Sequence, residues 1–186
     1  NCNLNCRYCF YTDVQKNRHV ASHGIMEMDV LDKIVENVFA NAKQRVSFSF
    51  QGGEPTLAGL DFFRQFIETV KKHNKAQIPV CYTIQTNGLV LDDAWASFFA
   101  ENRYLVGLSI DGTQAIHDTY RVTSDLKGTH HVVMEKVDLL KKNGVDFNVL
   151  TVVTSDVARN AREIYEFYKS KGILHQQYIP CISPFN

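Results

Sequence analysis

The chain has 186 residues, and 45% of them are hydrophobic, which is enough for one domain with a sizeable core. Its 20 basic and 20 acidic residues cancel, so it lacks the net positive charge that favours binding to nucleic acid or to an anionic membrane surface. No apolar run reaches the roughly 18 to 20 residues that span a bilayer, and the first residues do not resemble a signal peptide. We therefore expect a cytoplasmic protein with no nucleic-acid and no membrane partner. Five cysteines, three of them close together, argue against a disulfide framework and for a metal site in a reducing compartment.

The first eleven residues, NCNLNCRYCFY, contain three of the cysteines. Cys2, Cys6 and Cys9 are separated by three and then by two residues, so a short loop can bring three thiols together without offering a fourth. A structural zinc site takes four protein ligands, and His19 or His23 would have to supply the last one. Thiolates also suit iron–sulfur clusters, and a four-iron cluster on three cysteines leaves one iron free to bind another molecule. We favour the cluster, because the sequence distance to either histidine is long.

The rest of the chain alternates between two hydrophobic periodicities. Residues 12–24 are polar and predict a loop. Apolar residues at spacings of three and four predict helices over residues 28–39, 60–72, 92–100, 129–142 and 158–170. Short apolar runs that end at glycine or polar residues predict strands over residues 46–50, 80–85, 105–110, 147–153 and 177–179. This order is typical of an α/β fold with a parallel sheet, and we expect a partial parallel (β/α) barrel of about six units, cut at both ends.

Polar and glycine residues follow several of these strands. Parallel βα folds place ligands at the carboxyl ends of their strands. Gly52, Gly53 and Glu54 follow the first strand, and Ser109 ends the third. We expect them to share one face of the sheet with the three cysteines. A Gly-Gly pair lets the backbone approach a ligand closely, although a plain turn would explain it too.

The cysteine spacing followed by an aromatic residue resembles the radical S-adenosylmethionine (radical SAM) superfamily, and FQGGEPT at residues 50–56 resembles the anaerobic sulfatase-maturating enzymes within it. The resemblance runs the length of the chain. It implies that residues 1–186 form the radical SAM core domain of a longer protein, without the first strand and without a C-terminal domain that carries auxiliary clusters and a catalytic acid. It also implies that the open iron of a [4Fe–4S] cluster on Cys2, Cys6 and Cys9 chelates the amino and carboxylate groups of S-adenosylmethionine (AdoMet).

The resemblance assigns the AdoMet contacts residue by residue. Gly52, Gly53 and Glu54 match the motif that contacts the methionyl amino group. Ser109 and Arg121, in the segment SIDG…HDTYR, match the serine and arginine that hold its carboxylate, and an arginine fork is an apt partner for a carboxylate. Sheet packing for Ser109 and an ordinary exposed base for Arg121 are the alternatives.

Other predicted contacts are less tied to the motifs. Thr86 and Asn87 would reach the ribose or methionyl region, or simply form a tight turn. Tyr8 lies beside the last cysteine and would shield the cluster or pack on the cofactor. The resemblance suggests that Tyr11 and Gln51 contact the substrate peptide, with packing as the alternative.

The resemblance also implies a reaction. Reduction of the cluster would cleave AdoMet to methionine and a 5′-deoxyadenosyl radical, which takes a hydrogen atom from the β-carbon of a cysteine or serine in a sulfatase and so leads to formylglycine. The partners would be the sulfatase polypeptide and an electron donor such as flavodoxin or ferredoxin. Two alternatives remain. One is a radical maturase of another peptide, and the other is a binding module without catalytic activity in which zinc orders the N-terminal loop.

A few further residues have structural interpretations. The adjacent pair His117 and Asp118 would cap a helix, Trp95 would pack or lie at the surface, and Cys81 would be buried within a strand. The role of Cys181, after the last strand, stays open.

Overall fold

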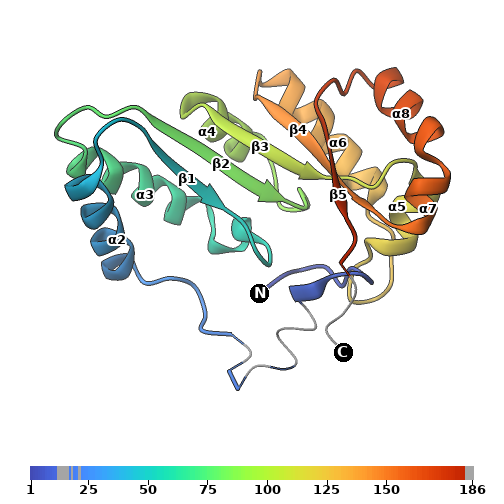
Figure 1. Cartoon of the computed structure of the whole chain (residues 1–186), viewed down its shortest axis with the longest axis horizontal. Coiled ribbons are helices and arrows are strands. Elements are labelled where there is room, and N and C mark those ends of the chain that lie inside the picture. Colours follow the sequence, from blue (N-terminus) through green and yellow to red (C-terminus); the bar gives the residue numbers. More distant parts are fainter. Residues whose placement is uncertain (12–16, 18, 21, 183–186) are drawn as a thin grey trace.

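The chain folds around one parallel sheet. The computed structural model describes residues 1–11, 17, 19–20 and 22–182, so much of the loop predicted at 12–24 lies outside the described residues. The strands are β1 (Val46–Phe50), β2 (Val80–Thr86), β3 (Tyr104–Ser109), β4 (Phe147–Val153) and β5 (Gln176–Pro180). Each pairs in parallel with the next in chain order, so every connection moves in the same direction across the sheet. The sheet curls into an open half-barrel (Figure 1), which confirms the predicted fold, with five strands in the described part where about six units were expected.

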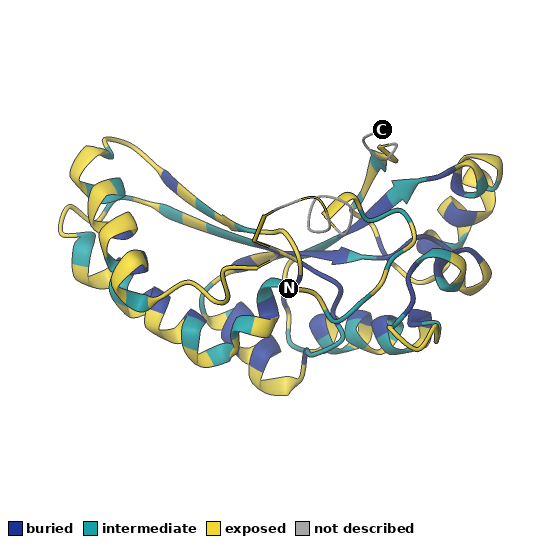
Figure 2. Ribbon diagram, turned by 90° about the horizontal axis from the view of Figure 1, so that it is seen from below, coloured by how far each residue is buried: buried dark blue, intermediate teal, exposed yellow. Residues whose placement is uncertain are grey.

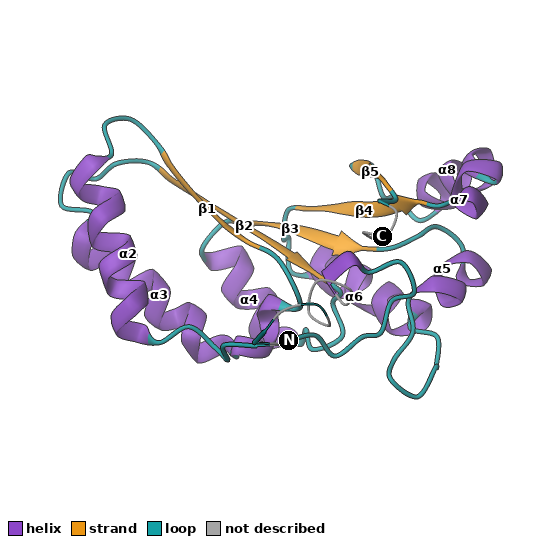
Figure 3. Ribbon diagram, turned by 60° about the horizontal axis from the view of Figure 1, so that its bottom comes forward, coloured by secondary structure: helices purple, strands orange, loops and turns teal. Residues whose placement is uncertain are grey.

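The helices lie on the outer side of this sheet (Figure 3). They are α2 (Met28–Asn41), the 3₁₀ helix η1 (Pro55–Ala58), α3 (Leu60–His73), α4 (Asp93–Glu101), α5 (Gln114–Tyr120), α6 (His130–Lys142), α7 (Ser155–Arg159) and α8 (Ala161–Ser170). No helix in the described ranges is long and apolar enough to cross a membrane.

Three helical features differ from the sequence prediction. The helix expected over residues 158–170 is two helices, because Thr154 caps α7 by accepting a hydrogen bond from Val157 N and the chain leaves helical geometry at Asn160. Helix α5 was not predicted, since its seven residues bury only Ile116 and His117 and are too short for a clear period. The short helix η1 was also missed.

The core lies between the helices and the outer face of the sheet. Phe50 of β1 packs against Phe63 and Phe66 of α3, with ring centroids 4.9 and 5.0 Å apart. Both α3 residues are completely buried, and each such burial contributes about 1.5–3 kcal/mol. Trp95 of α4 is buried against Phe63, so it is a packing residue. Figure 2 shows the buried residues where the helices meet the strands.

The inner face of the half-barrel is more polar. Ser49 and Thr83, on neighbouring strands, have their hydroxyl oxygens 2.7 Å apart. Cys81 lies on this face and is exposed, so the prediction that it is buried is wrong. The side chains of β2 alternate between the two faces of the sheet, as the sequence pattern predicts. No helix in the described part covers the inner face, so the β2 side chains on that face are not buried.

Candidate functional site

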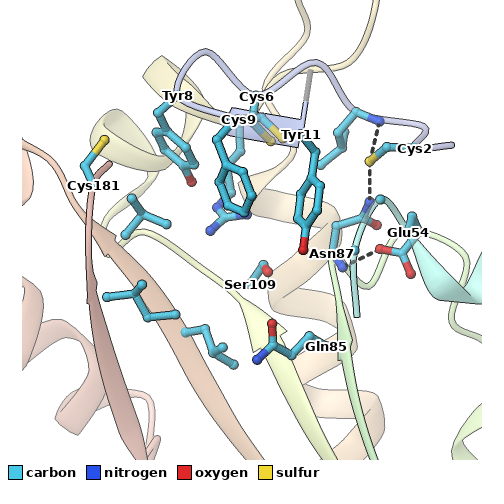
Figure 4. Close-up of a pocket in the computed structure, with 18 of the residues that line it drawn as sticks. Cys2, Cys6, Tyr8, Cys9, Tyr11, Glu54, Gln85, Asn87, Ser109 and Cys181 are labelled. Atoms are coloured by element: carbon cyan, nitrogen blue, oxygen red, sulfur yellow. Dashed lines mark hydrogen bonds between the residues drawn. The ribbon is translucent and has the colours of Figure 1, made fainter. Parts of the chain in front are cut away.

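A cavity of about 220 Å³ lies at the carboxyl ends of the strands (Figure 4). The N-terminal cysteine loop forms one wall and the strand ends form the others. All the predicted site residues except Gln51 line it, and the lining consists of Cys2, Leu4, Cys6, Tyr8, Cys9, Phe10, Tyr11, Gly52, Gly53, Glu54, Gln85, Thr86, Asn87, Ser109, Arg121, Leu150, Val152, Ile179, Pro180, Cys181 and Ile182.

Backbone hydrogen bonds hold the cysteine loop (residues 1–9) at both of its ends. Near its start, Glu54 N donates to Asn1 O at 2.8 Å. Further along, Asn5 N donates to Val122 O at 2.7 Å and Arg7 N donates to the carbonyl of residue 120 at 2.9 Å. The loop therefore spans from the turn after β1 to the segment after α5, across the mouth of the half-barrel.

The three cysteines of this loop are free thiols that face the cavity. Burial raises the pKa of Cys6 to about 11, although the nearby Arg121 guanidinium opposes that rise. Burial also raises the pKa of Cys2. Both thiols are therefore protonated at neutral pH until a metal displaces the proton, and metal loading must release protons.

The donor set fits a cluster better than a single ion. Among the described residues, no three His, Cys, Asp or Glu side chains lie close enough to hold one metal ion, so neither His19 nor His23 joins the cysteines in a zinc site. In an iron–sulfur cluster each thiolate binds a different iron, so the three sulfurs need not meet at one point. The cysteine loop offers three thiols, and the other thiol that lines the cavity, Cys181, follows β5 on the side opposite Asn87, so the loop matches a cluster that keeps one iron open.

The Gly52–Gly53 turn needs its glycines. Their φ angles are +92° and +58°, in a region that residues with a Cβ rarely adopt. A Cβ on Gly53 would lie only 2.3 Å from Asn1 O, and a Cβ on Gly52 would lie 3.3 Å from the Tyr11 hydroxyl oxygen. The turn thus lets the cysteine loop pass directly against the end of β1, which a plain turn would not require.

Glu54 joins the ends of β1 and β2. Its side chain is almost completely buried, and Oε1 accepts hydrogen bonds from Thr56 N, Thr56 Oγ1 and Thr86 Oγ1 at 3.0, 2.6 and 2.8 Å. Oε2 accepts from Asn87 N at 2.7 Å. Because a carboxylate oxygen has two lone pairs, Oε2 can still accept from a cationic ligand in the cavity.

Asn87 extends this connection to the cysteine loop. Its Nδ2 donates to Asn3 Oδ1 at 2.8 Å and lies 3.9 Å from Cys2 Sγ, while Leu4 N lies 3.4 Å from the same sulfur. Figure 4 shows Asn87 between Glu54 and Cys2. Asn3 was not singled out from the sequence, where nothing marks it as the partner of a residue 84 positions away.

Asp111 makes the corresponding connection on the other side of the cavity. Its buried carboxylate accepts hydrogen bonds from Arg121 Nε and Nη2 at 2.9 and 3.2 Å, from Val152 N at 2.9 Å and from the Tyr8 hydroxyl. Burial acts to lower the pKa of Arg121, but the Asp111 carboxylate together with the neighbouring Tyr8 and Cys6 outweighs it, so that pKa is raised. Burial, followed by the charge of Asp111, raises the pKa of Tyr8, so both donors keep their protons. In the sequence, Asp111 stands out only as part of the segment SIDG, which assigns it no role.

His117 fixes the backbone of Asp111. The ring Nδ1 accepts from Asp111 N at 3.2 Å, and Nε2 lies 3.1 Å from Thr129 Oγ1, which donates to the carbonyl of Arg121. Both ring nitrogens are therefore used by a neutral ring, and burial lowers the pKa of His117 to about 3. Asp118 accepts from the backbone N–H of His130 at the start of α6, as expected for a helix cap.

Three further residues lie in or beside the cavity. Gln51 lies in a neighbouring cavity of about 480 Å³ that shares Gly52 and Glu54 with the first one. Cys181 follows β5, is exposed and faces the cavity from the side opposite Asn87 (Figure 4). Gln85, which the sequence prediction did not select, points into the cavity from β2 below Ser109.

Comparison with known proteins identifies the family to which this chain belongs. Residues 1–168 match the model of the radical SAM superfamily. The chain belongs to that superfamily. This match confirms the family that the cysteine spacing predicted. Members of the superfamily use a [4Fe–4S] cluster and AdoMet.

Several radical SAM relatives are sulfatase-maturating enzymes. The cysteine-type anaerobic sulfatase-maturating enzyme of Clostridium novyi (strain NT) is 47% identical over 186 residues, which are 100% of this chain and 50% of that protein. The serine-type enzyme of Bacteroides thetaiotaomicron is 36% identical over 183 residues, 97% of this chain and 44% of that protein. The structure of native anSMEcpe with bound AdoMet matches 100% of this chain and 50% of its own, with a TM-score of 0.93 and 43% identity. The chain thus spans about half the length of these relatives.

Proposed function

We propose that this chain is the radical-generating domain of an anaerobic maturase that oxidises a cysteine or serine of a sulfatase to formylglycine. The observation that carries the proposal is the convergence of three free thiols, a Gly-Gly turn, Ser109 and Arg121 on one cavity at the strand ends. The sulfatase-maturating relatives support it, and the higher identity of the cysteine-type enzyme favours cysteine as the target.

The residues of the cavity divide the binding of cluster and AdoMet between them. Cys2, Cys6 and Cys9 would each hold one iron. When bound, the reduced [4Fe–4S] cluster supplies the electron that cleaves AdoMet to methionine and the 5′-deoxyadenosyl radical. Gly52 and Gly53 leave room for the methionyl amino group, because no side chain stands between that group and their backbone.

Polar side chains would orient the two ends of the methionyl group. The free lone pair of Glu54 Oε2 would accept from the ammonium. Ser109 and Arg121 would hold the carboxylate, because the Nη1 of Arg121 has no hydrogen-bond partner among the described residues. Thr86 and Asn87 are already engaged with Glu54 and Asn3, so they would act mainly by holding the cavity wall.

Aromatic residues and partners complete the proposal. Tyr8 and Tyr11 line the cavity and would exclude water from the cluster side, with Tyr11 and the neighbouring Gln51 facing the substrate peptide. Structures of anSMEcpe with AdoMet and the Kp18Cys or Cp18Cys peptide support a peptide substrate. A donor such as flavodoxin or ferredoxin would reduce the cluster, and a cytoplasmic location would keep the thiols reduced.

The test is an anaerobic reaction of the longer maturase that contains this domain with AdoMet, dithionite and a sulfatase peptide that contains the target cysteine. We expect 5′-deoxyadenosine together with a peptide in which the cysteine side chain has become an aldehyde. The same peptide with alanine at the target is the control, and a serine peptide measures the preference. Formation of 5′-deoxyadenosine without any change in either sulfatase peptide would favour a maturase of another peptide. A protein that holds one zinc and forms no 5′-deoxyadenosine would overturn the enzymatic proposal in favour of the zinc-ordered module.

A further inference from the structure

Asp111 is a fully buried carboxylate that the proposed reaction does not use. Its four hydrogen-bond donors come from three separate places: Tyr8 from the cysteine loop, Arg121 from the end of α5 and Val152 N from β4. A buried carboxylate survives in a core only when it is paired and hydrogen-bonded, and Asp111 is. It is therefore the point at which the cluster-binding loop and two strand ends are joined.

The hydrogen bonds to Asp111 also determine how Arg121 is oriented. Asp111 takes the side of the guanidinium formed by Nε and Nη2, with Nε to Oδ2 and Nη2 to Oδ1. Nη1 makes no hydrogen bond within the described part of the chain, and Arg121 lines the cavity. A planar guanidinium held along one side keeps its other N–H groups in a fixed direction, so little rotational freedom remains to be lost when a second carboxylate binds.

Tyr8 is tied to the same pair. Its hydroxyl donates to Asp111 Oδ2, and its ring centre lies 5.5 Å from the Arg121 guanidinium carbon. Tyr8 lies between Cys6 and Cys9, so the direction of Arg121 and the placement of the loop are set by one carboxylate.

We propose that Asp111 is a positioning residue that holds Arg121 with its free N–H groups directed at the carboxylate of the bound AdoMet. This inference rests on the proposed function. It predicts that Asp111 acts on AdoMet only through the carboxylate of the ligand, since no other part of AdoMet would meet Arg121.

The experiment compares two ligands on two proteins. Dissociation constants for AdoMet and for decarboxylated AdoMet, which keeps the amino group, sulfonium and adenosine, are measured by calorimetry on the anaerobically reconstituted wild type and Asp111→Asn. Asp111→Asn should weaken AdoMet binding about tenfold, which corresponds to about 1.4 kcal/mol, and should change binding of the decarboxylated ligand less than about twofold. Equal losses for both ligands would mean that Asp111 only supports the fold of the cavity. Tighter AdoMet binding by Asp111→Asn would mean that the carboxylate only neutralises Arg121. Either result overturns the inference while leaving the proposed function intact.

A second variant protects the test against misfolding. Tyr8→Phe removes one neutral donor to Asp111 but keeps the aromatic ring and both charges of the ion pair. It should weaken AdoMet binding about two- to threefold more than it weakens binding of the decarboxylated ligand, and an equal effect on both ligands would contradict the inference. A wild-type protein that carries the cluster and binds neither ligand would refute the proposed function, and the inference with it.

Discussion

Replacing Gly53 by alanine should destabilise the fold by more than backbone strain alone, because the cysteine loop would have to move. Gly53 has a φ of +58°, where an alanine costs about 1–2 kcal/mol. The added Cβ would also lie 2.3 Å from Asn1 O, so the start of the loop must move and the hydrogen bond from Glu54 N to Asn1 O is lost, at about 1 kcal/mol more. We expect a loss of roughly 2–3 kcal/mol in the free energy of unfolding.

Gly144 is a matched control for this substitution. Its φ is +64°, and a Cβ there would meet nothing within 4 Å, so Gly144→Ala should lose only the strain component of about 1–2 kcal/mol. Urea denaturation of the metal-free proteins measures both losses, and iron content after anaerobic reconstitution measures the effect on the site. Gly53→Ala should bind less iron than Gly144→Ala. Equal stability and equal iron content in the two variants would refute the idea that the close approach of loop and turn shapes the site.

Two further changes test the hydrogen-bond network around the cavity. Because burial lowers the pKa of His117 from 6.5 to about 3, the unfolded chain takes up a proton below pH 6.5 that the folded chain does not. The stability that the neutral His117 ring contributes is complete above pH 6.5 and is lost as the pH falls. Between pH 6 and 4, the unfolding free energy of the wild type should therefore fall more steeply than that of His117→Asn, by up to about 1.4 kcal/mol per pH unit. Parallel pH profiles of the two proteins would contradict this. Glu54→Gln should lower the free energy of unfolding by about 1–3 kcal/mol and reduce iron loading. The amide nitrogen would bring its N–H donors against the N–H and O–H groups that now donate to the carboxylate. Glu135→Gln, on the exposed side of α6, is its control, and an equal loss in both variants would show that the buried bonds of Glu54 contribute little.

The sheet and the location of the site follow from local patterns. The apolar period changes from about 3.6 within helices to 2 in β1 and β2, and this change predicts βα units whatever their partners are. Since parallel strands all end at one edge, the glycines after β1 and Ser109 at the end of β3 could be placed together with the cysteines before any contact was known. Boundaries were less predictable. The break at Asn160 depends on a single cap and one residue with non-helical geometry, which leave the apolar pattern almost unchanged.

The network that holds the site together could not be found in this way. Asp111 receives its hydrogen bonds from residues 8, 121 and 152, and Asn87 pairs with Asn3, so each bond depends on how distant segments meet in space. The burial of Cys81 was mispredicted for a related reason. A strand pattern gives the alternation of its side chains, but whether the second face is covered depends on elements elsewhere in the chain.

Whether the N-terminal cysteines bind the cluster is decided by the metal content and spectrum of anaerobically reconstituted protein, compared between Cys6→Ser and Cys81→Ser. Cys6 faces the cavity with Cys2 and Cys9, whereas Cys81 is an exposed thiol on the inner face of β2. The wild type and Cys81→Ser should each hold one [4Fe–4S] cluster on this chain whose electron paramagnetic resonance spectrum changes when AdoMet is added, and Cys6→Ser should lose both the cluster and the change. A single bound zinc, or a cluster that survives Cys6→Ser and disappears with Cys81→Ser, would contradict the account.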